Sequence, residues 1–210
     1  MSDIFTLMLR LEGPMQSWGY RSRFDYRDTA LEPTRSGVIG LVCAAMGIAR
    51  GEDISRFDAI SRMGVRVERE GKVERDYHTA LNVIKADGSG TDTVVSLRDY
   101  LADASFTIGL ESNKRDLLDE IAKALLSPIW TLFLGRKAFP LAVPPIIEPT
   151  NPVKPGMLEE HLLNGESNSR VILESLDGER TQHDSPLCFG ERRFKPRRMT
   201  VKFVPASINP

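Results

Sequence analysis

The segment before the first long apolar run carries side chains suited to contacts with RNA. Gln16, Ser17 and Trp18 are consecutive, and two arginines, Arg21 and Arg23, follow them. A glutamine amide can read a base edge, a hydroxyl can bond to a phosphate, and an indole can stack on a base. The pattern predicts RNA contacts in this segment, although Trp18 taken alone is better explained as a partly buried anchor of its loop.

A second group of candidate ligands stands where the first helix is expected to begin. Thr34, Arg35 and Ser36 combine two hydroxyls and a guanidinium just before the apolar run 38–49. The free N–H groups of a helix N-terminus favour anions, and a guanidinium adds a charged donor, so the group suits a phosphate. An ordinary N-cap by Thr34 or Ser36 explains the same residues. The sequence leaves both interpretations open.

Tyr77, His78 and Thr79 fall on a predicted hairpin strand. Side chains alternate along a strand, so Tyr77 and Thr79 would share one face, and His78 would share the other with Asp76. A histidine can act as general base at a ribose 2′-hydroxyl, which begins RNA cleavage without a metal. The same side chains could instead hold RNA, or form part of a plain surface hairpin.

Positive charge is also expected at Arg98, near the end of the hairpin, and at Arg136 and Lys137. The whole chain has 28 Lys and Arg against 29 Asp and Glu, a net charge of −1, which argues against a protein that coats nucleic acid non-specifically. That total conceals a net −5 over residues 148–184 and a net +5 over residues 185–210. A local basic patch is therefore compatible with the composition.

Several other classes of site are not expected. His78, His161 and His183 are far apart in the sequence, so no metal is predicted, and no phosphate-binding or dinucleotide-binding glycine motif predicts a cofactor. The two cysteines, Cys43 and Cys188, are too few for a disulfide scaffold and indicate reduced thiols. The apolar run 38–49 is shorter than the ~20 residues of a membrane span, so a cytoplasmic protein without membrane association is expected.

The predicted elements follow the order β, α, β, hairpin, β, α, β. Hydrophobic periodicity places them at 4–11, 34–48, 65–68, 73–97, 104–110, 114–126 and 130–134. This order predicts an α+β protein with a ferredoxin-like (RRM-like) βαββαβ domain, a plan shared by many RNA-binding modules. The domain is expected over residues 1–145, with a long β-hairpin thumb insertion at about 77–101. Residues 146–210 are expected to form a small C-terminal β appendage with strands at 170–176 and 199–204.

Five sequence blocks recur in the order and spacing of a known family. They are Gly13–Gly19, Pro33–Gly37, Arg75–Thr79, Tyr100–Phe106 and Leu134–Arg136. On these blocks the sequence, over about residues 4–145, resembles the CasD subunits of type I-E CRISPR Cascade complexes, within the repeat-associated RNA-binding superfamily.

The resemblance implies a subunit of a cytoplasmic antiviral ribonucleoprotein complex that holds the 5′ handle of the CRISPR RNA. It implies contacts with the backbone subunit, through the thumb, and with the large subunit, while target DNA is met only through the complex. In this branch a separate subunit cuts the precursor RNA, so a non-catalytic RNA-binding subunit is expected. A related branch of the family cuts RNA with tyrosine, histidine and lysine residues, so one alternative is a metal-independent endoribonuclease acting through His78 with Tyr77. A second alternative is a protein-interaction module without RNA contacts.

Overall fold

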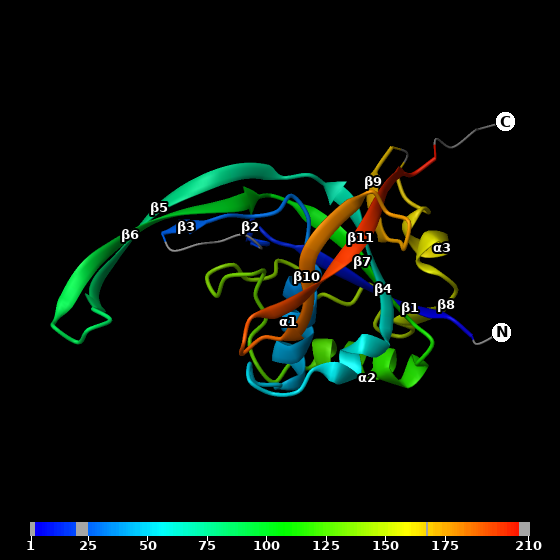
Figure 1. Cartoon of the computed structure of the whole chain (residues 1–210). Coiled ribbons are helices and arrows are strands. Elements are labelled where there is room, and N and C mark those ends of the chain that lie inside the picture. Colours follow the sequence, from blue (N-terminus) through cyan, green and yellow to red (C-terminus); the bar gives the residue numbers. More distant parts are fainter. Residues whose placement is uncertain (1–2, 20–24, 167, 206–210) are drawn as a thin grey trace.

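A long antiparallel sheet runs through the body of the protein (Figure 1). The computed structural model describes residues 3–19, 25–166 and 168–205. Within these residues the sheet has seven strands in the order β10-β11-β9-β4-β7-β1-β8, and every neighbouring pair is antiparallel. The strands are β1 (Phe5–Glu12), β4 (Ile60–Arg69), β7 (Ser105–Ser112), β8 (Val153–Pro155), β9 (Arg170–Glu174), β10 (Arg180–Cys188) and β11 (Arg193–Phe203).

Two helices, α1 (Arg35–Met46) and α2 (Arg115–Leu126), lie together on one side of this sheet (Figure 1). Their buried side chains join alternate residues of β1, β4 and β7 in a single apolar core. A short 3-10 helix, η1 (Ser55–Ala59), leads into β4 and adds Phe57 to this core. No helix among the described residues is both long enough and apolar enough to span a membrane.

The opposite face of the sheet is covered in part by α3 (Leu158–Leu162). Gly64 of β4 and Gly109 of β7 are register partners beneath this helix. A Cβ atom on Gly109 would lie 2.5 Å from Cδ2 of Leu158, a distance that real contacts do not reach. The paired glycines therefore create the space into which α3 packs.

The first helix begins and ends at the residue types that such positions favour. Oγ1 of Thr34 accepts a hydrogen bond from N–H of Gly37, so the predicted N-cap is confirmed. Gly47 ends the helix in the left-handed region at φ 71°. Apart from Arg35 and Ser36 the helix is apolar on all sides, as expected of a helix packed against other elements.

The strand predicted at 130–134 is wrong. N–H of Ile129 donates to the carbonyl of Ala45 at 2.9 Å, and N–H of Trp130 donates to that of Ala44 at 3.1 Å. The backbone of this segment thus satisfies carbonyls at the end of α1, which have no partner inside the helix. The strand that follows α2 in the sheet is β8, which pairs with β1. The α+β class and the order β1-α1-β4-β7-α2-β8 stand, with a later last strand.

The strands after residue 146 continue the same sheet. β9 pairs with β4, β11 pairs with β9, and β10 forms the edge. β10 was not predicted from the sequence, because polar residues, Pro186 and two register shifts interrupt its alternation. The division into residues 1–145 and 146–210 stays a prediction, and strands from both segments share one sheet.

A second, smaller sheet holds a long hairpin that reaches away from the body (Figure 1). Its strands are β2 (Met15–Gln16), β3 (Tyr26–Arg27), β5 (Lys72–Ile84) and β6 (Thr91–Ala102). β5 and β6 pair antiparallel, and their turn contains Gly88 and Gly90, both at positive φ. β2 and β3 pair with β6 near the end of the hairpin that joins the body, which is called here the hairpin root.

Candidate nucleic-acid interface

A cavity of about 620 Å³ opens between the start of α1, the hairpin root and the turn that joins β10 to β11. Five arginines line this arginine cavity: Arg27, Arg50, Arg98, Arg136 and Arg192. Its two acidic lining residues are Asp28 and Asp184, and Arg197 binds the carboxylate of Asp184 through two hydrogen bonds of 2.5 and 2.8 Å. The cavity therefore carries an excess of positive charge, which suits a phosphate backbone.

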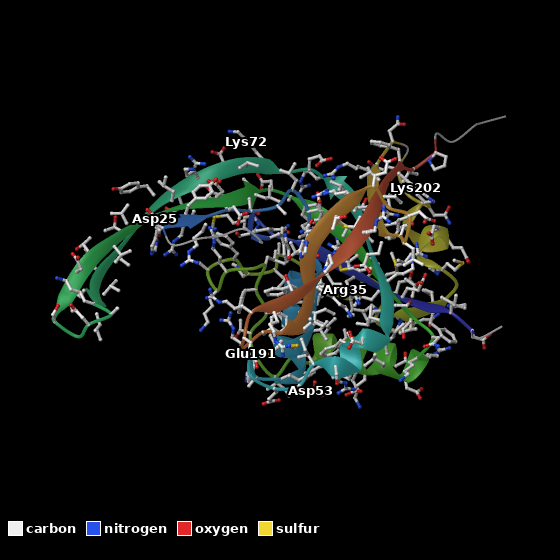
Figure 2. All side chains as sticks on the ribbon, viewed as in Figure 1. Asp25, Arg35, Asp53, Lys72, Glu191 and Lys202 are labelled. Atoms are coloured by element: carbon white, nitrogen blue, oxygen red, sulfur yellow. The ribbon has the colours of Figure 1, made fainter. Side chains whose placement is uncertain are left out.

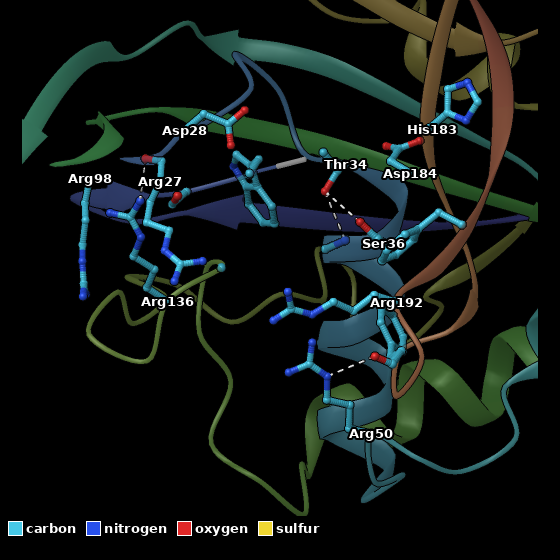
Figure 3. Close-up of a pocket in the computed structure, with 17 residues that line it drawn as sticks. Arg27, Asp28, Thr34, Ser36, Arg50, Arg98, Arg136, His183, Asp184 and Arg192 are labelled. Atoms are coloured by element: carbon cyan, nitrogen blue, oxygen red, sulfur yellow. Dashed lines mark hydrogen bonds between the residues drawn. The ribbon is translucent and has the colours of Figure 1, made fainter. Parts of the chain in front are cut away.

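The five arginines form two groups on opposite sides of the cavity. Figure 3 shows Arg27, Arg98 and Arg136 together beneath the hairpin root, and Arg50 and Arg192 beside α1. Residues from five separate segments of the chain thus meet at one place. An extended anion passing between the two groups could contact both.

Three of these side chains are fixed by hydrogen bonds to the protein. Arg136 donates to the carbonyl of Asp99 at 2.8 Å, and its guanidinium stacks over the ring of Phe139 at 5.4 Å. Arg98 donates to Oγ of Ser96 at 2.9 Å, and Arg50 donates to the carbonyl of Phe189 at 3.2 Å. The last contact joins the end of α1 to the β10–β11 turn.

Like charges are held close together beneath the hairpin root. Arg27 of β3 and Arg98 of β6 are register partners, and like charges in this position repel. Burial first, and then the charge of Arg98, lower the pKa of Arg136, although it remains protonated at neutral pH. A bound anion would relieve this repulsion. The local field therefore favours a phosphate at this point.

The hairpin root is organised by Asp99, whose side chain is buried. Its carboxylate accepts hydrogen bonds from Arg75 at 2.7 Å and from the hydroxyl of Tyr26 at 2.5 Å. The hydrogen bond from Arg75 is the main reason why the pKa of Asp99 lies below its usual value. Because the carbonyl of the same residue holds Arg136, Asp99 connects the hairpin to the arginine cavity.

The run Gln16-Ser17-Trp18 is mostly buried. Trp18 is 1% exposed, its indole N–H donates to Oε1 of Gln16 at 3.1 Å, and its ring packs against Gly37. The amide of Gln16 donates to the carbonyl of Ala104 at 2.7 Å, and Oγ of Ser17 donates to that of Asp99 at 3.4 Å. These contacts inside the protein fit Trp18 as an anchor of its loop, while Ser17 and Trp18 also line the arginine cavity, and the predicted RNA contacts of the three residues stay a prediction.

Arg35 makes its hydrogen bonds inside the protein. Its backbone N–H donates to Oδ2 of Asp184 at 2.9 Å, so a carboxylate of the chain itself occupies the helix N-terminus. Its guanidinium donates to Glu174 at 2.7 Å and to the carbonyl of Ile60 at 2.6 Å. Figure 2 shows Arg35 inside the body, between α1 and the C-terminal strands. The charge and donors of Arg35 are thus used within the protein, and its predicted phosphate contact stays a prediction that this arrangement does not favour.

The remaining predicted residues lie at different places. Ser36 lines the arginine cavity with Thr34, whereas Lys137 borders a second cavity along α1. Arg21 and Arg23 lie outside the residues that the structure describes.

Three further predicted residues belong to the hairpin. Tyr77, His78 and Thr79 lie on β5, and none of them is among the described residues that line the arginine cavity. Nδ1 of His78 lies 3.6 Å from Oδ2 of Asp76 on the shared face. These three residues thus lie next to the hairpin root but do not line the arginine cavity.

Three cavity arginines were absent from the predicted site. Arg27 and Arg192 belong to basic stretches that the sequence shows, but the stretches alone do not indicate which side chains converge. Arg50 follows the end of α1 and gives no local signal. Its position became evident only from the contact with Phe189, which is 139 residues away.

Comparison with known proteins agrees with the motif blocks. A family model described as CRISPR-associated protein (Cas_Cas5) matches residues 6–203. The chain is 35% identical, over 93% of its length and 94% of the other, to the CRISPR system Cascade subunit CasD of Escherichia coli (strain K12).

Two solved structures also share the fold and much of the sequence. One chain, described as belonging to a CRISPR RNA-guided surveillance complex, has a TM-score of 0.81 and 32% identity, and the match covers 97% of this chain and 92% of the other. A second, described as a Cas protein, has a TM-score of 0.76 and 38% identity, with 95% of each chain covered. The resemblance seen in the sequence is therefore confirmed, and the chain belongs to the CRISPR-associated Cas5 family, with CasD of Cascade among its relatives.

Proposed function

We propose that this protein is a non-catalytic, RNA-binding subunit of a Cascade-type surveillance complex. In this proposal a ferredoxin-like domain holds the 5′ handle of the CRISPR RNA, and the phosphates of the handle occupy the arginine cavity. The observation that carries the proposal is the convergence of five arginines from separate segments on one cavity. Arginine suits this role because its planar guanidinium binds phosphate through two parallel hydrogen bonds.

The hairpin formed by β5 and β6 is proposed as a thumb that contacts the backbone subunit. Its exposed apolar side chains include Tyr77, Leu81 and Ile84, each at least 68% exposed. Exposed apolar patches of this kind mark interaction surfaces. The large subunit would bind elsewhere on the body, target DNA would be met only through the complex, and the assembly would act in the cytoplasm.

Several observations favour binding over cleavage. His78 and Tyr77 are neighbours on a strand, so their side chains point to opposite faces of the hairpin. His78 has the carboxylate of Asp76 beside it only at 3.6 Å, beyond hydrogen-bond distance. The half-exposed imidazole nevertheless keeps the metal-independent endoribonuclease as the second candidate.

Cleavage is tested with the full chain and its CRISPR repeat RNA in the presence of EDTA. We expect binding without cutting, and the same result for His78→Ala. Specific cutting that disappears in His78→Ala would overturn the non-catalytic assignment and support the endoribonuclease.

Binding is tested with two cavity variants and one control. Arg27→Ala and Arg192→Asn each remove one guanidinium, and asparagine tolerates the positive φ of 53° at position 192. Each variant should bind the RNA more weakly and reduce the slope of log affinity against log salt by about 0.7 per lost phosphate contact.

Arg115→Ala is the matched control, because this arginine is exposed on α2 and pairs with Asp119. It should leave both the affinity and the slope unchanged. Unchanged affinity and slope in both cavity variants would favour a protein-interaction module that does not contact RNA.

The thumb is tested by deleting residues 86–91 and closing the hairpin with Asn-Gly. The tip lies outside the core, so thermal unfolding of the isolated chain should be unchanged. Co-purification with the backbone subunit should fall. Normal co-purification of a folded deletion variant would argue against this contact.

A further inference from the structure

A second cavity, of about 1120 Å³, runs along α1 and is called here the α1 groove. It is continuous with the arginine cavity, because both are lined by Ser36, Gly37, Arg50, Gly135 and Phe189. Its volume lies slightly above the roughly 300–1,000 Å³ of sites that hold small organic groups, so the groove is large enough for one.

The walls of the α1 groove are fixed. Trp130, which forms part of one wall, is held to the end of α1 by its backbone hydrogen bond to Ala44. Phe189, on another side, is held by the hydrogen bond from Arg50 to its carbonyl, and its ring packs edge-on against Phe194 at 6.4 Å. The groove is therefore a preformed feature of the fold.

The lining of the α1 groove combines aromatic rings with positive charge. Trp130, Phe133 and Phe189 contribute the rings, while Arg50 and Lys137, both exposed, contribute the charges. Helix α1 adds an uncharged surface from Gly37, Gly40, Leu41 and Ala44. A ligand that combines a flat apolar face with a negative charge fits this combination.

The internal packing of the protein does not explain why residue 40 is a glycine. Glycine inside a helix is less stable than alanine by ~1 kcal/mol. At position 37 the indole of Trp18 explains why the residue is glycine, since a Cβ atom there would lie 2.8 Å from the ring. At Gly40 a Cβ atom would meet only Phe189, at an ordinary 3.8 Å. The missing side chain at Gly40 leaves space in the groove itself.

We propose that the α1 groove receives one unstacked nucleobase of the RNA strand whose phosphates bind the arginine cavity. This proposal rests on the proposed function and adds a base site to it. Aromatic side chains stack on bases, and single-stranded RNA is commonly bound with its bases unstacked. The continuity of the two cavities at Arg50 allows adjacent atoms of one strand to occupy both.

The test fills the groove from the helix. Gly40→Leu places a good helix former at a position facing the groove, Gly40→Ala adds only one methyl group there, and Arg115→Ala on the exposed surface of α2 is the control. Trp130→Ala is a second variant that removes a ring and leaves the backbone bond to Ala44 in place. The probe is the single-stranded CRISPR repeat RNA of the protein's own locus, intact or with one abasic ribose at each position in turn, in filter binding to the full chain.

With the wild type and Arg115→Ala, we expect one abasic position to weaken binding by about tenfold or more. Gly40→Leu and Trp130→Ala should each bind intact RNA about tenfold more weakly, and that same abasic position should have no further effect in either. Equal affinity of Gly40→Leu and the wild type for intact RNA would overturn the proposal. An abasic effect that persists in both Gly40→Leu and Trp130→Ala would also overturn it.

Two results separate this proposal from the proposed function. If Arg27→Ala and Arg192→Asn weaken binding while Gly40→Leu does not, RNA binds the arginine cavity and the base site is wrong. If neither arginine variant changes binding, the proposed function itself fails. Loss of a protein partner from Gly40→Leu at unchanged RNA affinity would assign the groove to a protein segment and overturn the base site.

Discussion

The role of a single arginine depends on what surrounds it. Arg35 has the residue type and helix position of a phosphate ligand, but Glu174, Asp184 and the carbonyl of Ile60 already bind its donors. Arg197 completes this buried ion-pair cluster by binding both carboxylates. The cluster joins the start of α1 to β9, β10 and β11, so we assign Arg35 to stability.

Arg35→Ala should therefore destabilise the protein by roughly 3 kcal/mol, because two buried carboxylates would then share the single guanidinium of Arg197 and the carbonyl of Ile60 would lose its donor. Urea unfolding followed by circular dichroism should show a lower midpoint than the wild type. Arg115→Ala, on the exposed surface, is the control and should leave the midpoint unchanged. An unchanged midpoint for Arg35→Ala together with weaker RNA binding would return Arg35 to the RNA site.

Asp99 offers a test through pH. Its pKa in the folded protein is lowered, chiefly by the hydrogen bond from Arg75 and further by that from Tyr26. A lowered folded pKa means that the carboxylate stabilises the fold above the unfolded pKa of ~3.9, and that this contribution is lost as pH falls through the folded pKa.

The difference in unfolding free energy between wild type and Asp99→Asn should be largest near neutral pH and should shrink as pH falls below about 4. Urea titrations across this range measure it. A difference that does not change with pH would show that the charge of Asp99 contributes nothing to the hairpin root.

At the scale of elements, α1 serves two surfaces at once. One side packs in the core, while the side that carries Gly37, Gly40 and Ala44 lines the groove. The two glycines of this helix differ in their surroundings: Gly37 is pressed against the indole of Trp18, and Gly40 faces open space apart from Phe189.

Alanine substitutions at these two glycines should have opposite signs. Gly40→Ala should stabilise the protein by about 0.5–1 kcal/mol, because it restricts the unfolded chain and meets no close neighbour. Gly37→Ala should destabilise it by about 1–3 kcal/mol, because its methyl group would overlap the ring of Trp18. Thermal unfolding of the pair measures both, and the same sign in both variants would contradict this account of the helix.

At the scale of the whole molecule, one sheet crosses the predicted boundary at residue 145. β8 covers the edge of β1, and β9 covers the edge of β4. Residues far apart in the sequence also share the buried ion-pair cluster, since Arg35 and Glu174 are separated by 139 positions. The body therefore depends on contacts between the two segments.

We expect residues 1–145 expressed alone to lack a cooperative unfolding transition, because two strand edges and the guanidinium of Arg35 would lose their partners. Circular dichroism during urea unfolding, compared with the full chain, tests this. A cooperative transition in the fragment would support residues 1–145 as an independent domain.

Local pattern was enough to predict most of the elements and the family. Periodicity indicated β1, α1, β7 and α2, Thr34 was identified as a possible cap, and the five motif blocks pointed to the family that the comparisons confirm. The helices, strands, N-cap and motif blocks are set by residues within a few positions of one another, and such local patterns can be seen in the sequence itself.

The site itself depends on contacts between distant segments. The five cavity arginines come from the β3, α1, β6, 134–136 and β10–β11 regions, and whether a guanidinium points into a cavity or into an ion pair is set by packing. Arg35 and Trp18 were natural candidates by type but are buried, whereas Arg50 and Arg192 became evident only in the folded chain. Residue types indicated the chemistry, and long-range packing selected the side chains that remain available for it.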